Sequence, residues 1–73
     1  MADKYNFSTW LSEQMDKRNL TQAELARLAG VTRSAINGVL TGTRGPGNDL
    51  CLAIARALRL PPETVFRAAG LLP

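Results

Sequence analysis

The side chains of this sequence that are best placed to do chemistry together lie in "GVTRSAINGVLTG", from Gly30 to Gly42. Read as a helix, the stretch places apolar residues on one side and small or polar groups on the other. The polar side holds Ser34, Asn37, Gly38 and Thr41, and Arg33 precedes it. Such groups donate and accept hydrogen bonds. A glycine inside a helix costs about 1 kcal/mol relative to alanine, so Gly38 weakens the helix it lies in. The pattern indicates a face made for contact with another molecule.

Catalysis is not suggested by the rest of the chain. It has no histidine and a single cysteine, Cys51, so it offers no Cys/His pair, no internal disulfide and no zinc ligand set. It also lacks a glycine-rich phosphate loop after a strand and a plausible buried carboxylate pair. We therefore expect neither an enzyme nor a bound cofactor, metal or small-molecule substrate.

Length and composition indicate one domain covering residues 1–73. A hydrophobic content of 45% is typical of a folded globular domain. The net charge of +3 suits a polyanion partner and equally suits ordinary surface solvation. No apolar run approaches the roughly 20 residues of a membrane span, and "MADKYNFSTW" lacks a secretory core. We expect a cytoplasmic protein without a membrane segment.

Two helices are predicted in the first half of the chain. Phe7, Leu11 and Met15 recur at a helical spacing, which predicts a helix over 7–18 capped by Asn6 or Ser8. In "TQAELARLAG" the pair Thr21 and Glu24 has the spacing of a capping box and predicts a helix over 21–29. Its inner face is expected to hold Leu25, Ala26, Leu28 and Ala29. Gly30 would end it in the left-handed conformation.

Three more helices follow. Thr32 is a good N-cap for a helix over about 32–41, which Gly42 ends. "TGTRGPGND" forms a loop, after which Asn48 or Asp49 would cap a helix over 49–59 with Cys51 in its apolar stripe. A fifth short helix begins at Pro61 and Pro62 and is closed by Gly70. The expected fold is an all-α compact bundle of five short helices, with a helix-turn-helix formed by the second and third.

The stretch "TQAELARLAGVTRSAINGVL" resembles the Xre/Cro-type helix-turn-helix family, the lambda-repressor-like DNA-binding domains. With Gln22 as the first position of the motif, Ala26 is the fifth and Gly30 the ninth. Val31, Ile36 and Val39 occupy the usual apolar positions. The resemblance extends from about Phe7 to Phe66 and includes "LAIARALRLPPETVF".

The resemblance implies that the third helix reads double-stranded DNA in the major groove. An α-helix fits this groove, which is about 12 Å wide. Arg33 could bond guanine O6 and N7, or alternatively a phosphate, and Asn37 could bond adenine N6 and N7. Ser34 has a weak preference, and Thr32 either caps the helix or also offers a methyl group to thymine. Gly38 would give clearance for close approach. The implied base-contacting residues are Thr32, Arg33, Ser34, Asn37 and Gly38.

Phosphate contacts are implied at the start of the second helix and in the loop after the third. Such contacts position a protein on DNA without reading its sequence. The residues at these positions are Gln22, Thr41, Thr43, Arg44 and Asn48. The chain departs from the family pattern at Gly38, where a long polar residue is frequent, at Gly47, where Ser or Thr is common, and at Asn48, where an apolar residue is common.

The leading hypothesis is a bacterial or phage transcriptional regulator, such as a repressor, that occupies a palindromic operator. A homodimer would then place two reading helices one DNA turn apart. The alternative is a helical protein-interaction module of the same fold that does not bind DNA. Leu71 and Leu72 would either cover the core or pair with a second copy of the chain. A further alternative is that the chain is the DNA-binding part of a longer regulator.

Overall fold

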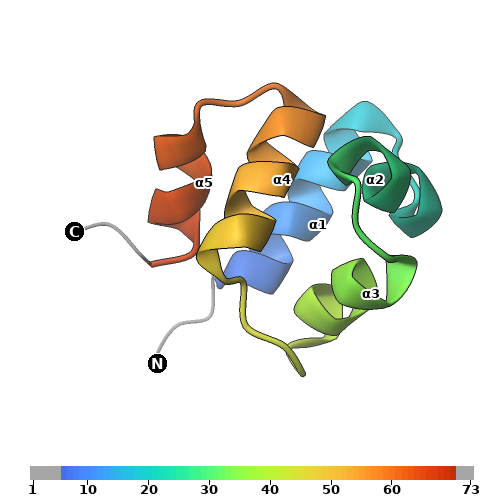
Figure 1. Ribbon diagram of the computed structural model, residues 1–73, viewed down its shortest axis with the longest axis horizontal. Coiled ribbons are helices and arrows are strands. Elements are labelled where there is room, and N and C mark those ends of the chain that lie inside the picture. Colours follow the sequence, from blue (N-terminus) through green and yellow to red (C-terminus); the bar gives the residue numbers. More distant parts are fainter. Residues whose placement is uncertain (1–5, 71–73) are drawn as a thin grey trace.

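The computed structural model describes residues 6–70 and forms a bundle of five α-helices (Figure 1). They are α1 (Phe7–Arg18), α2 (Gln22–Ala29), α3 (Arg33–Thr41), α4 (Asn48–Leu58) and α5 (Pro62–Ala68). Residues 6–70 contain no strand, so the predicted all-α fold is confirmed. None of the helices described is long and apolar enough to cross a membrane. The predictions for Leu71 and Leu72 lie outside the described residues.

Side-chain caps begin the first three helices. The Asn6 carboxamide oxygen accepts a hydrogen bond from the Thr9 N–H at 3.0 Å. At α2 the capping box is complete: the Glu24 N–H donates to the Thr21 hydroxyl at 3.1 Å, and the Thr21 N–H donates to the Glu24 carboxylate at 2.9 Å. At α3 the Thr32 hydroxyl accepts from the Ala35 N–H at 3.1 Å. These caps fix the start of each helix to the residue that the sequence predicts.

The capping box has a pH signature. The hydrogen bond from the Thr21 backbone, and then the one from its side chain, lower the pKa of Glu24 from its ordinary value. The carboxylate is therefore held in its charged form in the folded protein. Its contribution to stability is complete above the ordinary pKa of a glutamate and is lost as the pH falls through the lowered pKa.

Two details of the predicted helices are wrong. Gly47, not Asn48 or Asp49, is the N-cap residue of α4, and no side chain caps this helix. Asn48 and Asp49 lie in the first turn of α4. Leu28 is 53% exposed, although it was expected on the inner face of α2. One turn takes about 3.6 residues, so Leu28 points roughly 110° away from the centre of the face formed by Leu25 and Ala26.

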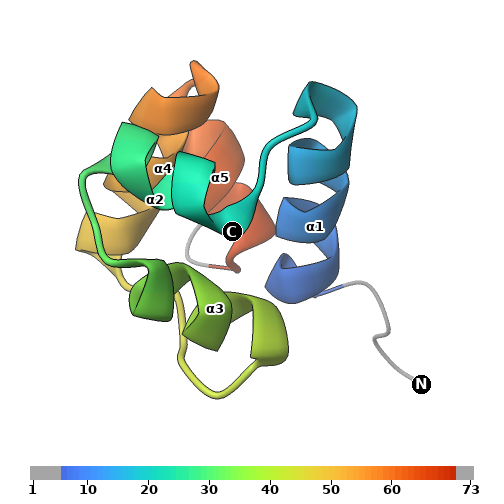
Figure 2. The ribbon, with the colours of Figure 1, turned by 90° about the vertical axis from the view of Figure 1, so that its right-hand side faces the viewer.

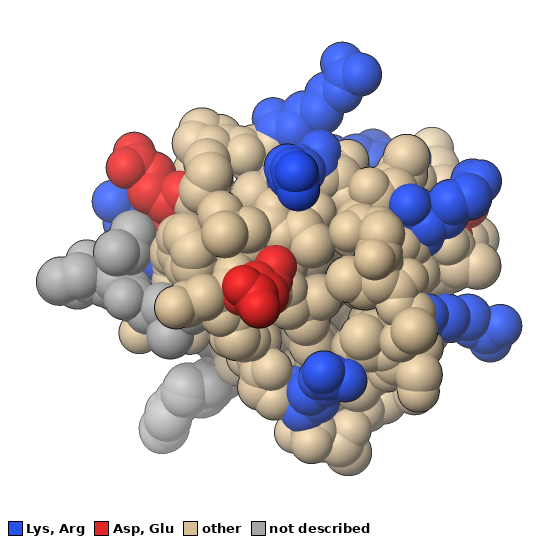
Figure 3. All heavy atoms as spheres, viewed as in Figure 1, with Lys and Arg blue, Asp and Glu red and all other residues tan. Residues whose placement is uncertain are grey.

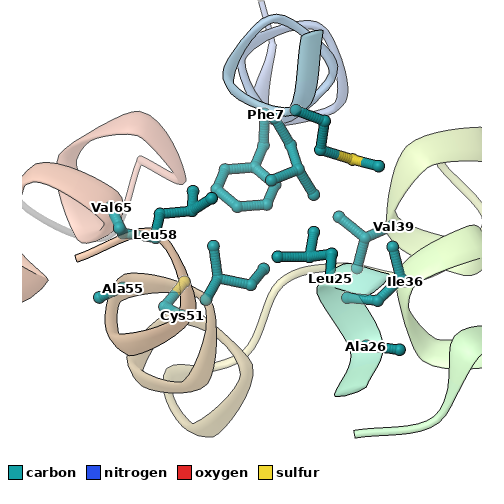
Figure 4. Close-up of a cluster of buried hydrophobic side chains, with 12 residues drawn as sticks. Phe7, Leu25, Ala26, Ile36, Val39, Cys51, Ala55, Leu58 and Val65 are labelled. Atoms are coloured by element: carbon teal, nitrogen blue, oxygen red, sulfur yellow. The ribbon is translucent and has the colours of Figure 1, made fainter. Parts of the chain in front are cut away.

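The core lies where the five helices meet (Figure 4). Phe7 projects from α1 into the space between α4 and α5 on one side and α2 and α3 on the other. The largest fully buried side chains come from all five helices: Leu11, Leu25, Ile36, Val39, Cys51, Ile54 and Val65. No polar or charged side chain within residues 6–70 is buried. The fold of residues 6–70 therefore rests on apolar packing.

Candidate nucleic-acid interface

The angle between α2 and α3 is set by two small residues. Ala26 is 4% exposed and lies where α2 packs against α3, so its methyl group lets the two helices approach closely. Gly30 has φ +72°, a left-handed conformation that ends α2 and turns the chain sharply. The Val31 N–H then donates to the Ala26 carbonyl at 3.0 Å and closes the turn. The predicted helix-turn-helix geometry is therefore present.

The turn leaves α3 with one buried and one open face. Ala35, Ile36 and Val39 point into the core. The opposite face is exposed to solvent and carries Arg33, Ser34, Asn37 and Thr41. The Thr32 hydroxyl also lies at the surface, but it accepts the Ala35 N–H, so the predicted capping role is confirmed.

Gln22 joins this open face from the neighbouring helix. A shallow hollow is lined by Gln22, Arg33, Ser34 and Asn37. The first residue of α2 therefore lies beside the N-terminal half of α3. We name these four residues the reading face. In Figure 3, basic side chains stand at the edge of the molecule beside α2 and α3. The reading face is polar and hollowed, and Arg33 gives it a positive charge.

The loop 42–47 lies next to the reading face. Figure 2 shows it leaving the C-terminal end of α3 and running back beneath the helix to α4. The Thr41 and Thr43 hydroxyls both donate to the Gly38 carbonyl, at 3.2 and 3.3 Å. They also lie 3.1 Å from each other. Both threonines, predicted as phosphate contacts, therefore have their hydroxyls turned toward the end of α3 in the free protein.

Gly38 is half-buried, and its open side is filled by the chain itself. A Cβ atom built on it would lie 3.1 Å from the Arg44 Cβ and 3.6 Å from the Thr43 Oγ1. The sequence suggested that the glycine gives clearance to DNA, and contact with a base edge here stays a prediction. In the structure, the segment that approaches Gly38 closely is the loop, at Thr43 and Arg44.

A second hollow lies at the start of α4. It is lined by Arg44, Asn48, Asp49 and neighbouring loop residues. The first backbone bond of α4 runs from the Cys51 N–H to the Gly47 carbonyl at 2.9 Å, and no side chain caps the helix. The N–H groups of its first turn are thus open to an anion, in a hollow that Arg44 also lines. Asp49 in the same hollow opposes an anion and limits this attraction.

Cys51 anchors the loop instead of taking part in the surface chemistry. Its side chain is fully buried in α4, and the thiol donates to the Pro46 carbonyl at a sulfur–oxygen distance of 3.9 Å. Burial raises the pKa of the thiol from its ordinary value. The group therefore stays protonated at neutral pH, and the predicted core role is confirmed. Residues 6–70 contain no cluster of three metal-ligating side chains.

Ser8 supports α3, a role that no pattern in the sequence indicates. Its hydroxyl donates to the Val39 carbonyl at 2.6 Å, across 31 positions of the chain. Val39 lies in the last turn of α3, where carbonyl groups lack partners within the helix. Ser8 therefore ties the C-terminal end of α3 to α1. A serine in the first turn of a helix is ordinarily read as a cap, so only the packing of α1 on α3 reveals this contact.

We expect Ser8→Ala to lower the free energy of unfolding by about 1 kcal/mol, which is the net contribution of one hydrogen bond. The loss stays modest because the Val39 carbonyl also accepts from the Gly42 N–H at 3.3 Å. Urea unfolding followed by circular dichroism measures it. Ser12→Ala, at an exposed position of the same helix, is the matched control and should stay within about 0.5 kcal/mol of the wild type. Equal effects of the two substitutions would contradict the anchoring role.

Comparisons with known proteins agree with this geometry. The family model described as helix-turn-helix matches residues 11–65. Two uncharacterized HTH-type transcriptional regulators of Mycobacterium tuberculosis, from strains CDC 1551 / Oshkosh and ATCC 25618 / H37Rv, are each 30% identical over 64 residues. The match covers 88% of this chain and 46% of each relative, so the chain spans about half the length of these regulators. The matched segment includes the close pair α2 and α3 with its turn at Gly30. The chain belongs to the Xre/Cro-type helix-turn-helix family and has its all-α, lambda-repressor-like fold.

Proposed function

We propose that this chain is a sequence-specific DNA-binding module of a transcriptional regulator that works in the cytoplasm. The observation that carries the proposal is the reading face: Gln22, Arg33, Ser34 and Asn37 share one hollow on the open side of a rigidly packed helix. Family membership and the two related regulators support it. In this mode of binding, α3 enters the major groove while α2 crosses the DNA backbone.

The chemistry of each residue follows from its place. Arg33 and Asn37 extend from successive turns of α3 and carry the groups that pair with guanine and adenine. Ser34 lies between them and adds a less selective contact. Thr32 holds the start of the helix with its hydroxyl and has its methyl group left for thymine. Direct contact of Gly38 with a base edge would require the segment 43–44, which lies over the glycine, to move aside.

Phosphates would be held on both sides of the groove. Gln22, at the N-terminal end of α2, binds one with its amide, assisted by the positive end of the helix. Arg44 and the open N–H groups at Asn48 bind another at the second hollow. Thr41 and Thr43 reach a phosphate only by turning their hydroxyls away from the Gly38 carbonyl. The operator is palindromic in this proposal, and two copies of the chain bind it as a homodimer.

The salt dependence of binding tests the proposal. We expect the protein to bind a fluorescent duplex at micromolar concentration in low salt, because lysine and arginine displace condensed cations from the DNA. The logarithm of the association constant should fall linearly with the logarithm of the salt concentration, by about 0.9 for each phosphate neutralised. Fluorescence anisotropy at a series of salt concentrations measures the slope. Absence of binding to any duplex at low salt would contradict the proposal.

Arg44→Ala and Arg67→Ala form a matched pair for this titration. Both remove one exposed arginine and hence the same charge. Arg67 belongs to α5, on the side of the molecule away from α3 (Figure 1). Arg44→Ala should reduce the slope by about 1 and Arg67→Ala should leave it unchanged. Equal slopes for the two variants would show binding by general charge attraction alone.

A protein-interaction role is the second candidate, and one observation favours it. Leu28 on α2 and Leu52 on α4 are 53% and 42% exposed, and exposed apolar side chains mark a contact surface where they form a continuous patch. The salt titration separates the two functions, because an apolar contact shows little dependence on salt. Neither leucine belongs to the reading face, so the two functions are also separable by substitution.

A further inference from the structure

The backbone conformation of Gly38 does not call for glycine. It lies inside α3, and its φ is not in the left-handed region that favours glycine. What it provides is the absence of a side chain. A Cβ here would lie 3.1 Å from the Arg44 Cβ and 3.5 Å from the Arg44 Cδ, so the arginine stem crosses directly over the glycine. A contact of 3.1 Å is too close for two carbon atoms, which are best separated by about 3.5–4.0 Å.

The carbonyl group of the same residue holds the loop in this place. The Thr43 and Arg44 N–H groups donate to the Gly38 carbonyl at 3.0 and 3.1 Å. The Thr41 and Thr43 hydroxyls point to the same oxygen. The Arg44 Cβ is bonded directly to the backbone that these hydrogen bonds fix, so it cannot move aside by a change of rotamer. An added methyl group at Gly38 therefore requires the backbone at Arg44 to give by a few tenths of an ångström.

We propose that Gly38 is a positioning residue for Arg44. Its bare surface lets segment 43–44 fold back onto the last turn of α3, and its carbonyl holds that segment there. The backbone of Arg44 and the stem of its side chain are thereby kept at a fixed place against the last turn of α3. The role in DNA binding rests on the proposed function, in which Arg44 contacts a phosphate. The loop geometry is independent of it and is tested without DNA.

Amide hydrogen exchange of the free protein tests the geometry. Gly38→Ala should raise the exchange rates of the Thr43 and Arg44 amides by about tenfold or more, as expected for local opening, and leave those of core residues such as Ile54 unchanged. Gly45→Ala is the matched control, because a Cβ there meets nothing within 4 Å. Unchanged protection of Thr43 and Arg44 in Gly38→Ala would overturn the proposal.

If Gly38→Ala does not fold, a second variant decides. Arg44→Gly removes the opposing Cβ, so the pair Gly38→Ala with Arg44→Gly should recover the circular dichroism of the wild type. Failure of this pair to fold, when Arg44→Gly alone folds, would mean that Gly38 is needed for something other than Arg44, and the proposal would be wrong.

A double-mutant cycle tests the role in binding. Gly38→Ala should reduce the salt slope by about 0.9, the value for one phosphate contact, and leave base preference unchanged. In an Arg44→Ala background the same substitution should change the slope no further. A further change there would mean that Gly38 acts on DNA directly. If the wild type binds no DNA while the exchange result holds, the proposed function fails and the loop geometry stands.

Discussion

Arg33→Ala should remove about 1–3 kcal/mol of DNA-binding free energy at a single base pair and leave discrimination at the other positions unchanged. Arg33 is the first residue of α3, is exposed, and lies in the reading face. In helix-turn-helix proteins the N-terminal residues of the reading helix are the ones that contact base edges. A bidentate arginine–guanine pair distinguishes bases because no other base presents the same two acceptors.

Binding to a panel of duplexes, each changed at one position, measures this effect. Arg33→Lys is the matched control, because it keeps the charge and loses the planar pair of donors. It should lose the preference for guanine and retain the salt slope. Both variants should unfold within about 0.5 kcal/mol of the wild type, since the side chain is exposed. A loss that is uniform across all duplexes would make Arg33 a phosphate contact.

Leu25→Ala should lower the free energy of unfolding by about 2–5 kcal/mol, a large part of the stability of so small a domain. Leu25 has no exposed surface and packs in the core between α2 and its neighbours. Alanine is a good helix former, so the loss reports the removed side chain and the cavity it leaves, rather than the propensity of α2.

Leu28→Ala supplies the comparison within the same helix. Leu28 is 53% exposed, so its truncation should cost less than about 1 kcal/mol. Guanidinium unfolding of both variants gives the difference. Similar costs for the two leucines would mean that Leu28 is buried in solution, as the sequence pattern alone had predicted.

The helices were predictable because their signals are local. The capping box of Thr21 and Glu24 and the N-cap Thr32 lie within one turn of the helices they begin. Gly30 ends α2 in the conformation that glycine favours. The end of α4 carries no such signal: Arg59 adopts φ 59° without the help of a glycine. The predicted start of α4 was wrong by one residue, because asparagine is a more common N-cap residue than the glycine found there, Gly47.

The arrangement of the candidate site was predictable only where it follows from the face of one helix. Arg33, Ser34 and Asn37 share the open side of α3, and the structure adds Gln22 to them. The supports of α3 depend on long-range packing, which a pattern along one helix does not contain. Ser8 reaches Val39 only after α1 packs on α3. Gly38 acquires its close neighbour only after the loop folds back, and that path depends on the Gly38 carbonyl itself.

Selection of duplexes from a random pool measures whether the reading face binds one DNA sequence in preference to others. We expect enrichment of a short palindromic site with a guanine in each half, and loss of that guanine when the selection is repeated with Arg33→Ala. A pool that stays random after repeated rounds, in low salt and with folded protein, would mean that the reading face does not select a DNA sequence.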